Sequence, residues 1–385
     1  MDQTSSTASG KARPPLARKV RQIMLIAASF IVACLLILAG VLVAGSPGTP
    51  RPIVDEHGNP VPGSLSEKIV VSINGADQGM FIRSRNPANP VLLFVHGGPG
   101  VPEYWLTAKY PSHLEDYFTV CWWEQRGAGL SYHPDIPAQT MTYAQLISDT
   151  IAVTDYLRQR FDKEKIYLMA HSGGSFFAIQ AAAQRPDLYY AYIGMGQMVY
   201  GLRSEQLAQA YMLTKFKESG NTQAVTLLED NPVTLDSPLP AAYDRVRDAY
   251  MHSLGIGTTR DMRSVEADIF LASWFSRDYT LGEKVNFWRG KFWSKDLLWK
   301  TAMMTDLRPQ ISELQLPVYF LHGAYDYTVA YPLTRDFAAQ LKAPIKGFYT
   351  FAQSAHTPLF EEPAAVVKVL RDDVLAGTTS LADPN

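Results

Sequence analysis

The sequence IYLMAHSGGS, residues 166–175, carries the pattern from which the fold of this chain can be predicted. Its apolar first half predicts a strand, AHSGG at 170–174 predicts a tight turn, and residues 175–183 are typical of a helix. Small residues on both sides of Ser172 allow a strained turn that exposes the serine hydroxyl, because bulky residues there would collide with the neighbouring strands. Ser172 is therefore a candidate nucleophile. The alternative is a glycine-rich turn without chemistry.

Strand signals alternate with helical signals on both sides of this turn. Further strands are predicted at residues 69–73, 80–84, 91–95, 118–123, 191–195, 318–321 and 347–351, and helices at residues 142–161 and 363–375. Asn74-Gly75 is typical of the turn in an opening hairpin, and Thr142 with Gln145 forms a capping box. Apolar strands that alternate with helices predict an α/β fold, with a mostly parallel central sheet and helices on both faces.

The alternation stops between residues 201 and 304. This block has helical patterns throughout and contains Trp274, Trp288, Trp293 and Trp299. Because it separates two buried strands, we expect a helical cap at residues 201–304, inserted into a core formed by residues 65–200 and 305–376. A separate helical domain is the alternative. At least half of the four tryptophans are expected to serve ordinary packing.

Residues 23–45 form an uninterrupted run of apolar or small residues, long enough to cross a hydrocarbon core of about 30 Å as a transmembrane helix. Five basic residues in segment 1–22 precede it, whereas Arg51 is the first basic residue after it. The positive-inside rule then predicts a cytoplasmic N-terminus, disordered to about residue 20, with the bulk of the chain across the membrane. The alternatives are a signal peptide cleaved at residues 44–46, lipidation of Cys34 and a buried soluble helix.

The composition of the rest of the chain limits the partners and cofactors that can be expected. Residues 46–64 are rich in Pro and Gly and predict a semi-extended linker that holds the globular part away from the bilayer, and residues 377–385 predict a flexible tail. With 47% hydrophobic residues and a formal net charge of −2, there is no reason to expect a nucleic-acid partner. Cys34 and Cys121 are the only two cysteines, so neither a disulfide framework nor a thiolate metal site is supported. No metal or organic cofactor is implied.

An acid and a histidine follow Ser172 in the order nucleophile, acid, base, which this strand-turn-helix architecture requires. The strand at 318–321 leads into a loop that carries Asp326, at the carboxyl edge where α/β sheets place their sites. His356 follows the last strand, and of the eight histidines in the chain only His356 satisfies both order and location. His356 could accept the serine proton while Asp326 stabilises the imidazolium. Asp306 is a rival for the role of Asp326.

The sequence HGGPG at 96–100 directly follows a predicted strand. Consecutive glycines let backbone N–H groups approach a ligand, and the loop beside the elbow strand supplies half of an oxyanion hole in this architecture. We therefore assign the oxyanion hole to the N–H groups of Gly98 and Gly173. The side chain of His171, on the other side of the serine, is expected to point away. A plain turn is the alternative for the loop.

Five motifs together resemble the proline iminopeptidase-type α/β-hydrolases, over roughly residues 68–375. They are HGGPG at 96–100, EQRGAGLS at 124–131, the elbow at Ser172, GAYD at 323–326 and SAH at 354–356. The resemblance implies an α/β-hydrolase fold and a serine hydrolase whose helical cap carries acidic residues that hold the free N-terminal amine of a substrate. LRSE at 202–205 resembles the cap segment with one of those glutamates. Glu205 is therefore a candidate substrate-binding residue, with Glu229 as the second.

Three positions depart from the pattern of that family. It usually has Asp at the position of Glu124, Gly at Ala170 and often Trp at Gly173. The first two differences keep the charge or the small size of the side chain. The loss of a large ring at Gly173 is expected to open the pocket beside the nucleophile, which affects specificity for proline. For Glu205 the alternative is a solvated helix carboxylate.

These observations predict a membrane-anchored serine hydrolase with its catalytic domain outside the cytoplasm. In the most specific form of this hypothesis it is an aminopeptidase that releases a small or proline N-terminal residue from short peptides. Ser172 attacks the carbonyl, His356 transfers the proton and water releases the acyl-enzyme. An esterase or lipase-like hydrolase of small apolar esters is the alternative that the Trp-rich cap and the anchor favour. A catalytically inactive binding module on the same fold is a third.

Overall fold

The computed structural model of the chain describes residues 16–384. Its centre is one eight-stranded sheet in the order β1-β2-β4-β3-β5-β6-β7-β8. The strands are β1 (Leu65–Ile73), β2 (Ala76–Ser84), β3 (Val91–Val95), β4 (Thr119–Trp123), β5 (Ile166–His171), β6 (Tyr189–Met195), β7 (Val318–Gly323) and β8 (Lys346–Phe351). β2 is antiparallel to both β1 and β4, and all the other neighbouring pairs are parallel. The expected mostly parallel α/β sheet is confirmed.

Local sequence explains why these strands form. The hairpin of β1 and β2 turns at Asn74 and Gly75, whose φ angles of 48° and 74° lie in the left-handed region. A two-residue hairpin turn needs such angles, and Asn-Gly tolerates them at low cost. All five residues of β3 are buried, with Leu93 in the apolar core on one face of the sheet and Leu92 in the core on the other. A strand covered on both faces therefore has a continuous apolar sequence.

Helices cover both faces of the sheet. They are α2 (Tyr143–Arg160), α3 (Ser172–Gln184), α8 (Tyr331–Gln340), α9 (Pro358–Glu361) and α10 (Pro363–Val369), the last followed by a π-helical turn at Leu370–Val374. Short 3-10 helices lie at Tyr104–Ala108, Leu114–Asp116, Gly129–Ser131, Ala138–Thr140 and Pro186–Leu188. α2, α3 and α8 pack into one apolar core, and α10 packs into the other. Thr142 caps α2 as expected, because its hydroxyl accepts the N–H of Gln145 at 3.2 Å.

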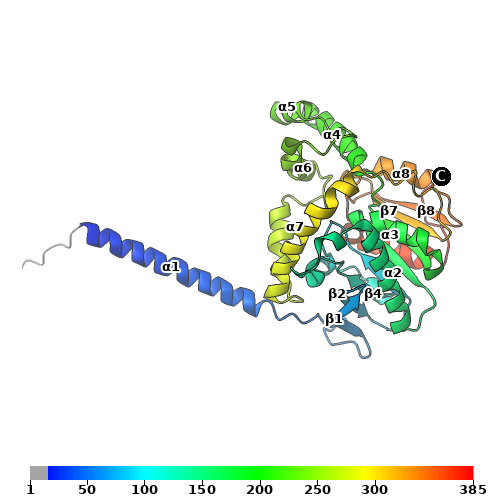
Figure 1. Cartoon of the computed structure of the whole chain (residues 1–385), viewed down its shortest axis with the longest axis horizontal. Helices are drawn as coiled ribbons and strands as arrows, with labels where there is room; N and C mark the ends of the chain where they lie inside the picture. The colour runs from blue at the N-terminus through cyan, green and yellow to red at the C-terminus, as the bar shows by residue number, and fades with distance from the viewer. Residues whose placement is uncertain (1–15, 385) are drawn as a thin grey trace, which may run out of the picture.

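The residues between β6 and β7 are helical and lie over the edge of the sheet where the strands end (Figure 1). They form α4 (Gly201–Glu218), α5 (Thr222–Asp230), α6 (Ala241–Ser253), a π-helical segment at Glu266–Leu271 and α7 (Leu281–Met304). Thr280 and Glu283 begin α7 with a reciprocal capping box, which explains why this long helix starts there. α4, α5 and α6 share a small apolar core of their own. We refer to this helical block as the cap.

The N-terminal helix α1 (Leu16–Ala44) extends away from the rest of the chain (Figure 1). Its apolar side chains are exposed, and residues Arg18–Ala44 are long and apolar enough to cross a membrane. The helix begins at Leu16, before the apolar run predicted at 23–45, because the basic residues Arg18, Lys19 and Arg21 continue the same helix. The rest of the expected basic segment, residues 1–15, lies outside the described residues.

The segment that follows α1 does not hold the globular part away, and that prediction is wrong. Residues 45–53, which we call the connecting segment, bind the cap. The Lys284 ammonium donates to the Ser46 hydroxyl at 2.7 Å, and the Arg51 guanidinium pairs with the Asp278 carboxylate at 2.8 Å. These partners lie more than 200 positions away in sequence, so Pro/Gly content alone could not reveal them.

The predicted flexible tail is also wrong for the residues that the structure describes. The Asp383 N–H donates to the Phe348 carbonyl at 2.8 Å, and its carboxylate accepts the Thr350 N–H at 3.2 Å. Arg335 adds an ion pair to the same carboxylate at 3.2 Å. The tail is held because β8 is the last strand of the sheet, so its outer edge offers unpaired backbone groups.

Candidate active site

Ser172 lies in the sharp turn between β5 and α3 with a φ of 52°, in the left-handed region that non-glycine residues rarely adopt. The turn is packed against the loop at 96–100. A Cβ on Gly174 would lie 2.2 Å from the His96 carbonyl oxygen, and a Cβ on Gly173 would lie 2.2 Å from the Gly98 carbonyl oxygen. Only glycine fits at either position, which is the physical reason for the small residues after the serine.

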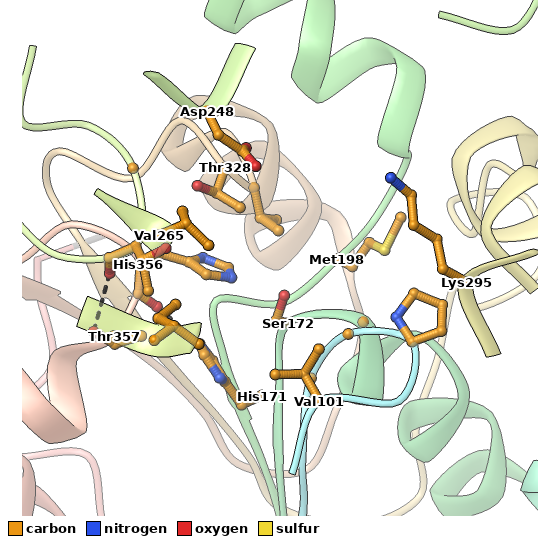
Figure 2. Close-up of a pocket in the computed structure, with 18 of the residues that line it drawn as sticks. Val101, His171, Ser172, Met198, Asp248, Val265, Lys295, Thr328, His356 and Thr357 are labelled. Atoms are coloured by element: carbon orange, nitrogen blue, oxygen red, sulfur yellow. Dashed lines mark hydrogen bonds between the residues drawn. The ribbon is translucent and has the colours of Figure 1, made fainter. Parts of the chain in front are cut away.

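Asp326 and His356 meet beside this turn, from the loops after β7 and β8. The His356 Nδ1–H donates to Asp326 Oδ2 at 2.8 Å, and both side chains are buried. Asp326 Oδ1 accepts the Val329 N–H at 2.9 Å, which fixes the carboxylate. Figure 2 shows the Ser172 hydroxyl and the His356 ring facing the same cavity. With Nδ1 engaged by the carboxylate, Nε2 is the nitrogen of His356 left to act on a substrate or on the serine.

The cavity above Ser172 has a volume of about 280 Å³. The elbow, the loop at 96–100 and the loop after β8 form its floor, and the cap forms its walls. Gly98 and Gly173, the residues assigned to the oxyanion hole, both line it. No cluster of three or more His, Cys, Asp or Glu side chains among the described residues could hold a metal ion.

The side chain of His171 does not leave the site, and that prediction is wrong. Its Nε2–H donates to the His356 carbonyl at 2.9 Å, and the two rings lie 4.7 Å apart between centroids. Its Nδ1 lies 2.8 Å from Glu103 Oε1, which also accepts the Gly97 N–H at 2.7 Å. Glu103 was not singled out by the sequence analysis, because no local pattern marks a carboxylate that acts on a residue 68 positions away.

The Glu103–His171 contact is an ion pair. Burial opposes the charge on His171, but the Glu103 carboxylate outweighs it and raises the pKa of His171. Burial acts to raise the pKa of Glu103, and His171 outweighs that effect and lowers it. Burial lowers the pKa of His356 against the opposing effect of Asp326, and the charge on His171 lowers it further. The pair therefore favours the neutral, base-competent form of His356.

The two predicted amine-binding glutamates have different positions. Glu205 lines the cavity from α4, where its carboxylate accepts from the Tyr243 hydroxyl at 2.8 Å and from Arg247 Nε at 2.7 Å. Burial raises the pKa of Glu205 despite the nearby Arg247 guanidinium. Glu229, by contrast, is exposed on α5 and pairs with Lys217 at 2.6 Å, outside the cavity. The prediction for Glu229 is corrected, because its face of α5 is turned to solvent.

Charged residues that the sequence analysis did not single out line the cavity from two helices. Asp244 and Asp248 come from α6, and Lys291 and Lys295 come from α7. Figure 2 shows Asp248 and Lys295 on different sides of Ser172. The spacing of Asp244, Arg247 and Asp248 on one helix face was a signal in the sequence. The sequence alone does not show that this face of α6 covers the cavity, so the spacing could not be interpreted without the structure.

Known proteins share the fold of this chain. The family described as the alpha/beta hydrolase fold matches residues 90–363 of the chain. The chain belongs to that family. It is 32% identical over 303 residues to "Probable aminopeptidase YbaC" of Bacillus subtilis (strain 168), covering 78% of this chain and 93% of the relative.

More distant relatives agree with this assignment. This α/β-hydrolase is 23% identical over 292 residues to the proline iminopeptidase of Heyndrickxia coagulans, covering 74% of this chain and 91% of the relative. The crystal structure of a proline iminopeptidase-related protein from Thermus thermophilus superposes with a TM-score of 0.54 at 20% identity, covering 82% of this chain and 99% of that one. The chain is therefore an α/β-hydrolase that is similar to proteins of the proline iminopeptidase type, and the fold class predicted from its sequence is confirmed.

The departures from that type have structural consequences. Glu124 is buried, accepts the Leu130 N–H at 2.6 Å and bonds the Tyr279 hydroxyl, and burial raises its pKa to about 8. We expected the missing ring at Gly173 to leave an open space beside the nucleophile, and that prediction is wrong. The Gly98 backbone lies where a side chain at position 173 would begin. The loop at 96–100 therefore closes onto this α/β-hydrolase's elbow.

We expect Gly173→Ala to impair this hydrolase. The added methyl group would meet the Gly98 carbonyl oxygen and displace the loop to which we assign one oxyanion-hole donor. Loss of one oxyanion-hole donor typically lowers kcat by about 10²–10³. Steady-state kinetics on the purified enzyme would measure the loss. Gly282→Ala on α7 is the matched control, because a Cβ there meets nothing within 4 Å. Equal kcat values for the two variants would contradict the packing argument.

Proposed function

We propose that this protein is a serine hydrolase that works through an acyl-enzyme. The observation that supports this most is that Ser172 and His356 line one cavity while Asp326 accepts the Nδ1–H of His356 from behind, each residue coming from a separate loop. His356 accepts the Ser172 proton as the hydroxyl attacks the carbonyl, and Asp326 stabilises the resulting imidazolium. The N–H groups of Gly98 and Gly173 receive the oxyanion. Water then attacks the acyl-enzyme, with His356 again as the base.

The substrate we infer is a short peptide with a free N-terminal amine. Two relatives are named as an aminopeptidase and a proline iminopeptidase. Glu205, Asp244 and Asp248 form an acidic wall on one side of the cavity, and Arg247 is the one guanidinium beside them. Burial acts to raise the pKa of Asp248, but Arg247 outweighs it and lowers the pKa, which keeps this carboxylate charged. An ammonium group is the natural partner of such a wall.

The opposite wall suits the other end of a short peptide. Lys291 and Lys295 line the cavity from α7, away from the acidic residues of α6. A cavity of about 280 Å³ is at the small end for ligand sites. We infer that the enzyme prefers peptides of a few residues, with the released N-terminal residue toward α6 and the leaving portion toward α7.

We also propose that α1 is a retained membrane anchor, with the N-terminus in the cytoplasm and the catalytic part on the other side. The flanking basic residues support this orientation. The connecting segment supports retention, because the Lys284 ammonium contacts the Gly45 carbonyl, the Ser46 hydroxyl and the Trp274 carbonyl. Cleavage after Ser46 would remove two of these three oxygens from a lysine that is 3% exposed.

A hydrolase of small apolar esters is the second candidate. Ile269 and Trp288 line the cavity from the cap and would suit an apolar acyl group. An inactive binding module is a third hypothesis from another class. The tests below distinguish the three.

We expect Ser172→Ala to lower kcat by about 10⁴-fold or more, because the nucleophile is lost while the fold is kept. The measurement is turnover of aminoacyl-arylamides and short esters, together with labelling by a fluorophosphonate probe. Wild-type protein should react with the probe and the variant should not. Unlabelled wild-type protein would favour the binding module, and undiminished turnover by the variant would exclude Ser172 as the nucleophile.

We expect N-acetylation of the peptide substrate to lower kcat/KM by about 10- to 100-fold, the value of one or two charge-assisted hydrogen bonds. Asp248→Asn and Glu205→Gln should cause similar losses on free peptides and none on esters. The Asp248 side chain is 59% exposed although it pairs with Arg247, so its variant leaves a smaller buried defect than the Glu205 variant does. Glu229→Gln, outside the cavity, is the matched control. If neither acetylation nor the cavity variants matter, the ester hydrolase is the better supported function.

We expect the acid limb of the pH profile of kcat/KM to lie below the ordinary histidine value of about 6.5, because burial and His171 lower the pKa of His356. A base with a lowered pKa stays neutral, and the enzyme stays active, until the pH falls through that lower value. His171→Asn removes a positive charge and should move the limb upward by about one pH unit. His133→Asn, at an exposed site, is the control. An unmoved limb would show that His171 does not tune the base.

A further inference from the structure

The cap carries an exposed apolar surface beside its π-helical segment. Phe275, Phe292, Leu271 and Phe270 are 70%, 56%, 53% and 38% exposed. Large exposed apolar groups that adjoin one another mark contact surfaces rather than ordinary surface residues. We define the aromatic face as Phe270, Leu271, Trp274, Phe275 and Phe292, with the buried Trp288 ring behind it.

Ring contacts join Phe270, Trp274 and Phe292 through the buried Trp288 ring. Phe270 lies 6.2 Å from Trp274 and 4.7 Å from Trp288 between ring centroids. Trp288 lies 6.3 Å from Phe292, and the Lys291 ammonium lies over both of these rings at 5.0 and 5.1 Å. Trp, Phe and Lys in one patch are the residue types found where proteins meet the lipid–water interface.

The aromatic face is connected to the end of α1. The Lys284 ammonium bonds the Trp274 carbonyl at 2.7 Å and the Ser46 hydroxyl at 2.7 Å, and Ser46 is the second residue after the helix. The Gly48 N–H donates to the Arg277 carbonyl at 3.2 Å. No free linker therefore separates the helix from this part of the cap, and α7 lies on the side of the molecule from which α1 leaves (Figure 1).

The aromatic face also reaches the cavity. The buried Trp288 contacts Phe270 and Phe292 of that face and also lines the cavity, together with Lys291 and Ile269. Apart from the buried Lys284, helix α7 carries four basic residues, at 289, 291, 295 and 300, against the acidic Glu283 and Asp296. This excess of positive charge suits anionic lipid headgroups.

We propose that the aromatic face lies against the bilayer that holds α1, and that substrates with an apolar tail reach the cavity along it from the lipid interface. The proposal rests on the proposed membrane anchor. The exposed rings insert among the headgroups, and the basic side chains of α7 contact lipid phosphates. A substrate whose tail lies in the same bilayer then presents its hydrolysable bond at Trp288, on the wall of the cavity.

Site-specific fluorescence in the full chain tests the docking. The native Cys34 in α1 is exposed and Cys121 is buried, so the environment-sensitive dye NBD can be attached to Cys34 alone. Cys34→Ser then allows NBD at Phe275→Cys on the aromatic face, or at Tyr190→Cys, which is 47% exposed at the start of β6. Each labelled protein is reconstituted in vesicles of phosphatidylcholine with phosphatidylglycerol that contain spin-labelled lipids. Fluorophosphonate labelling checks that each variant is folded.

Docking predicts that NBD at 275 is quenched several-fold more than NBD at 190, and most by lipids labelled near the headgroup, while NBD at Cys34 is quenched by deep labels. Quenching at Cys34 with none at 275 would overturn the proposal and leave the anchor standing. Absence of quenching at all three positions would overturn both the anchor and the docking.

Kinetics test the delivery of substrate. Phe275 and Phe292 do not line the cavity. The double variant Phe275→Asp/Phe292→Asp should hydrolyse a soluble prolyl-arylamide at the wild-type rate. On a prolyl peptide with a C-terminal hexadecylamide in vesicles it should be several-fold slower. Tyr190→Asp is the matched control and should match the wild type on both. An equal rate of the double variant and the wild type on the lipidated peptide would contradict delivery along this face.

Discussion

The close approach of the elbow at Ser172 to the loop at 96–100 governs the geometry of the whole site. Gly173 and Gly174 each lie so near a carbonyl oxygen of that loop that a Cβ would be 2.2 Å from it. The serine is held at a positive φ because these backbones pack without side chains between them. Gly98 and Gly173 both line the cavity beside Ser172, so the same contact holds the proposed nucleophile and the proposed oxyanion donors together.

A chain of hydrogen bonds joins the loop at 96–100, the elbow and the loop after β8. It runs from the Gly97 N–H through Glu103 and His171 to the backbone of His356. A shift of the loop at 96–100 would therefore be transmitted to His356. Because the charges on Glu103 and His171 are buried and paired, this chain of hydrogen bonds also has an electrostatic effect on the His356 ring beside it. The Glu103–His171 pair thus influences both the position of His356 and the affinity of its ring for a proton.

Helix α7 connects the end of α1 with the cavity. Its first turns hold the connecting segment through Lys284, and its middle supplies Trp288 and Lys291 to the cavity. The contacts of Gly45, Ser46 and Gly48 therefore fix the point at which α1 leaves the rest of the chain. In the proposed function, this arrangement keeps the mouth of the cavity near the bilayer, where a tethered enzyme would find amphiphilic substrates.

Local patterns in the sequence were enough to predict the sheet, the elbow, and the chain order of Ser172, Asp326 and His356, because these depend on apolar strands, small residues and turn signals. The folded chain was needed to establish the positions of His171, Glu103 and Asp248, the exclusion of Glu229, and the docking of the connecting segment and the tail. Each of these depends on partners far apart along the chain, and no local pattern records which distant group a side chain will meet once the cap has folded over the sheet.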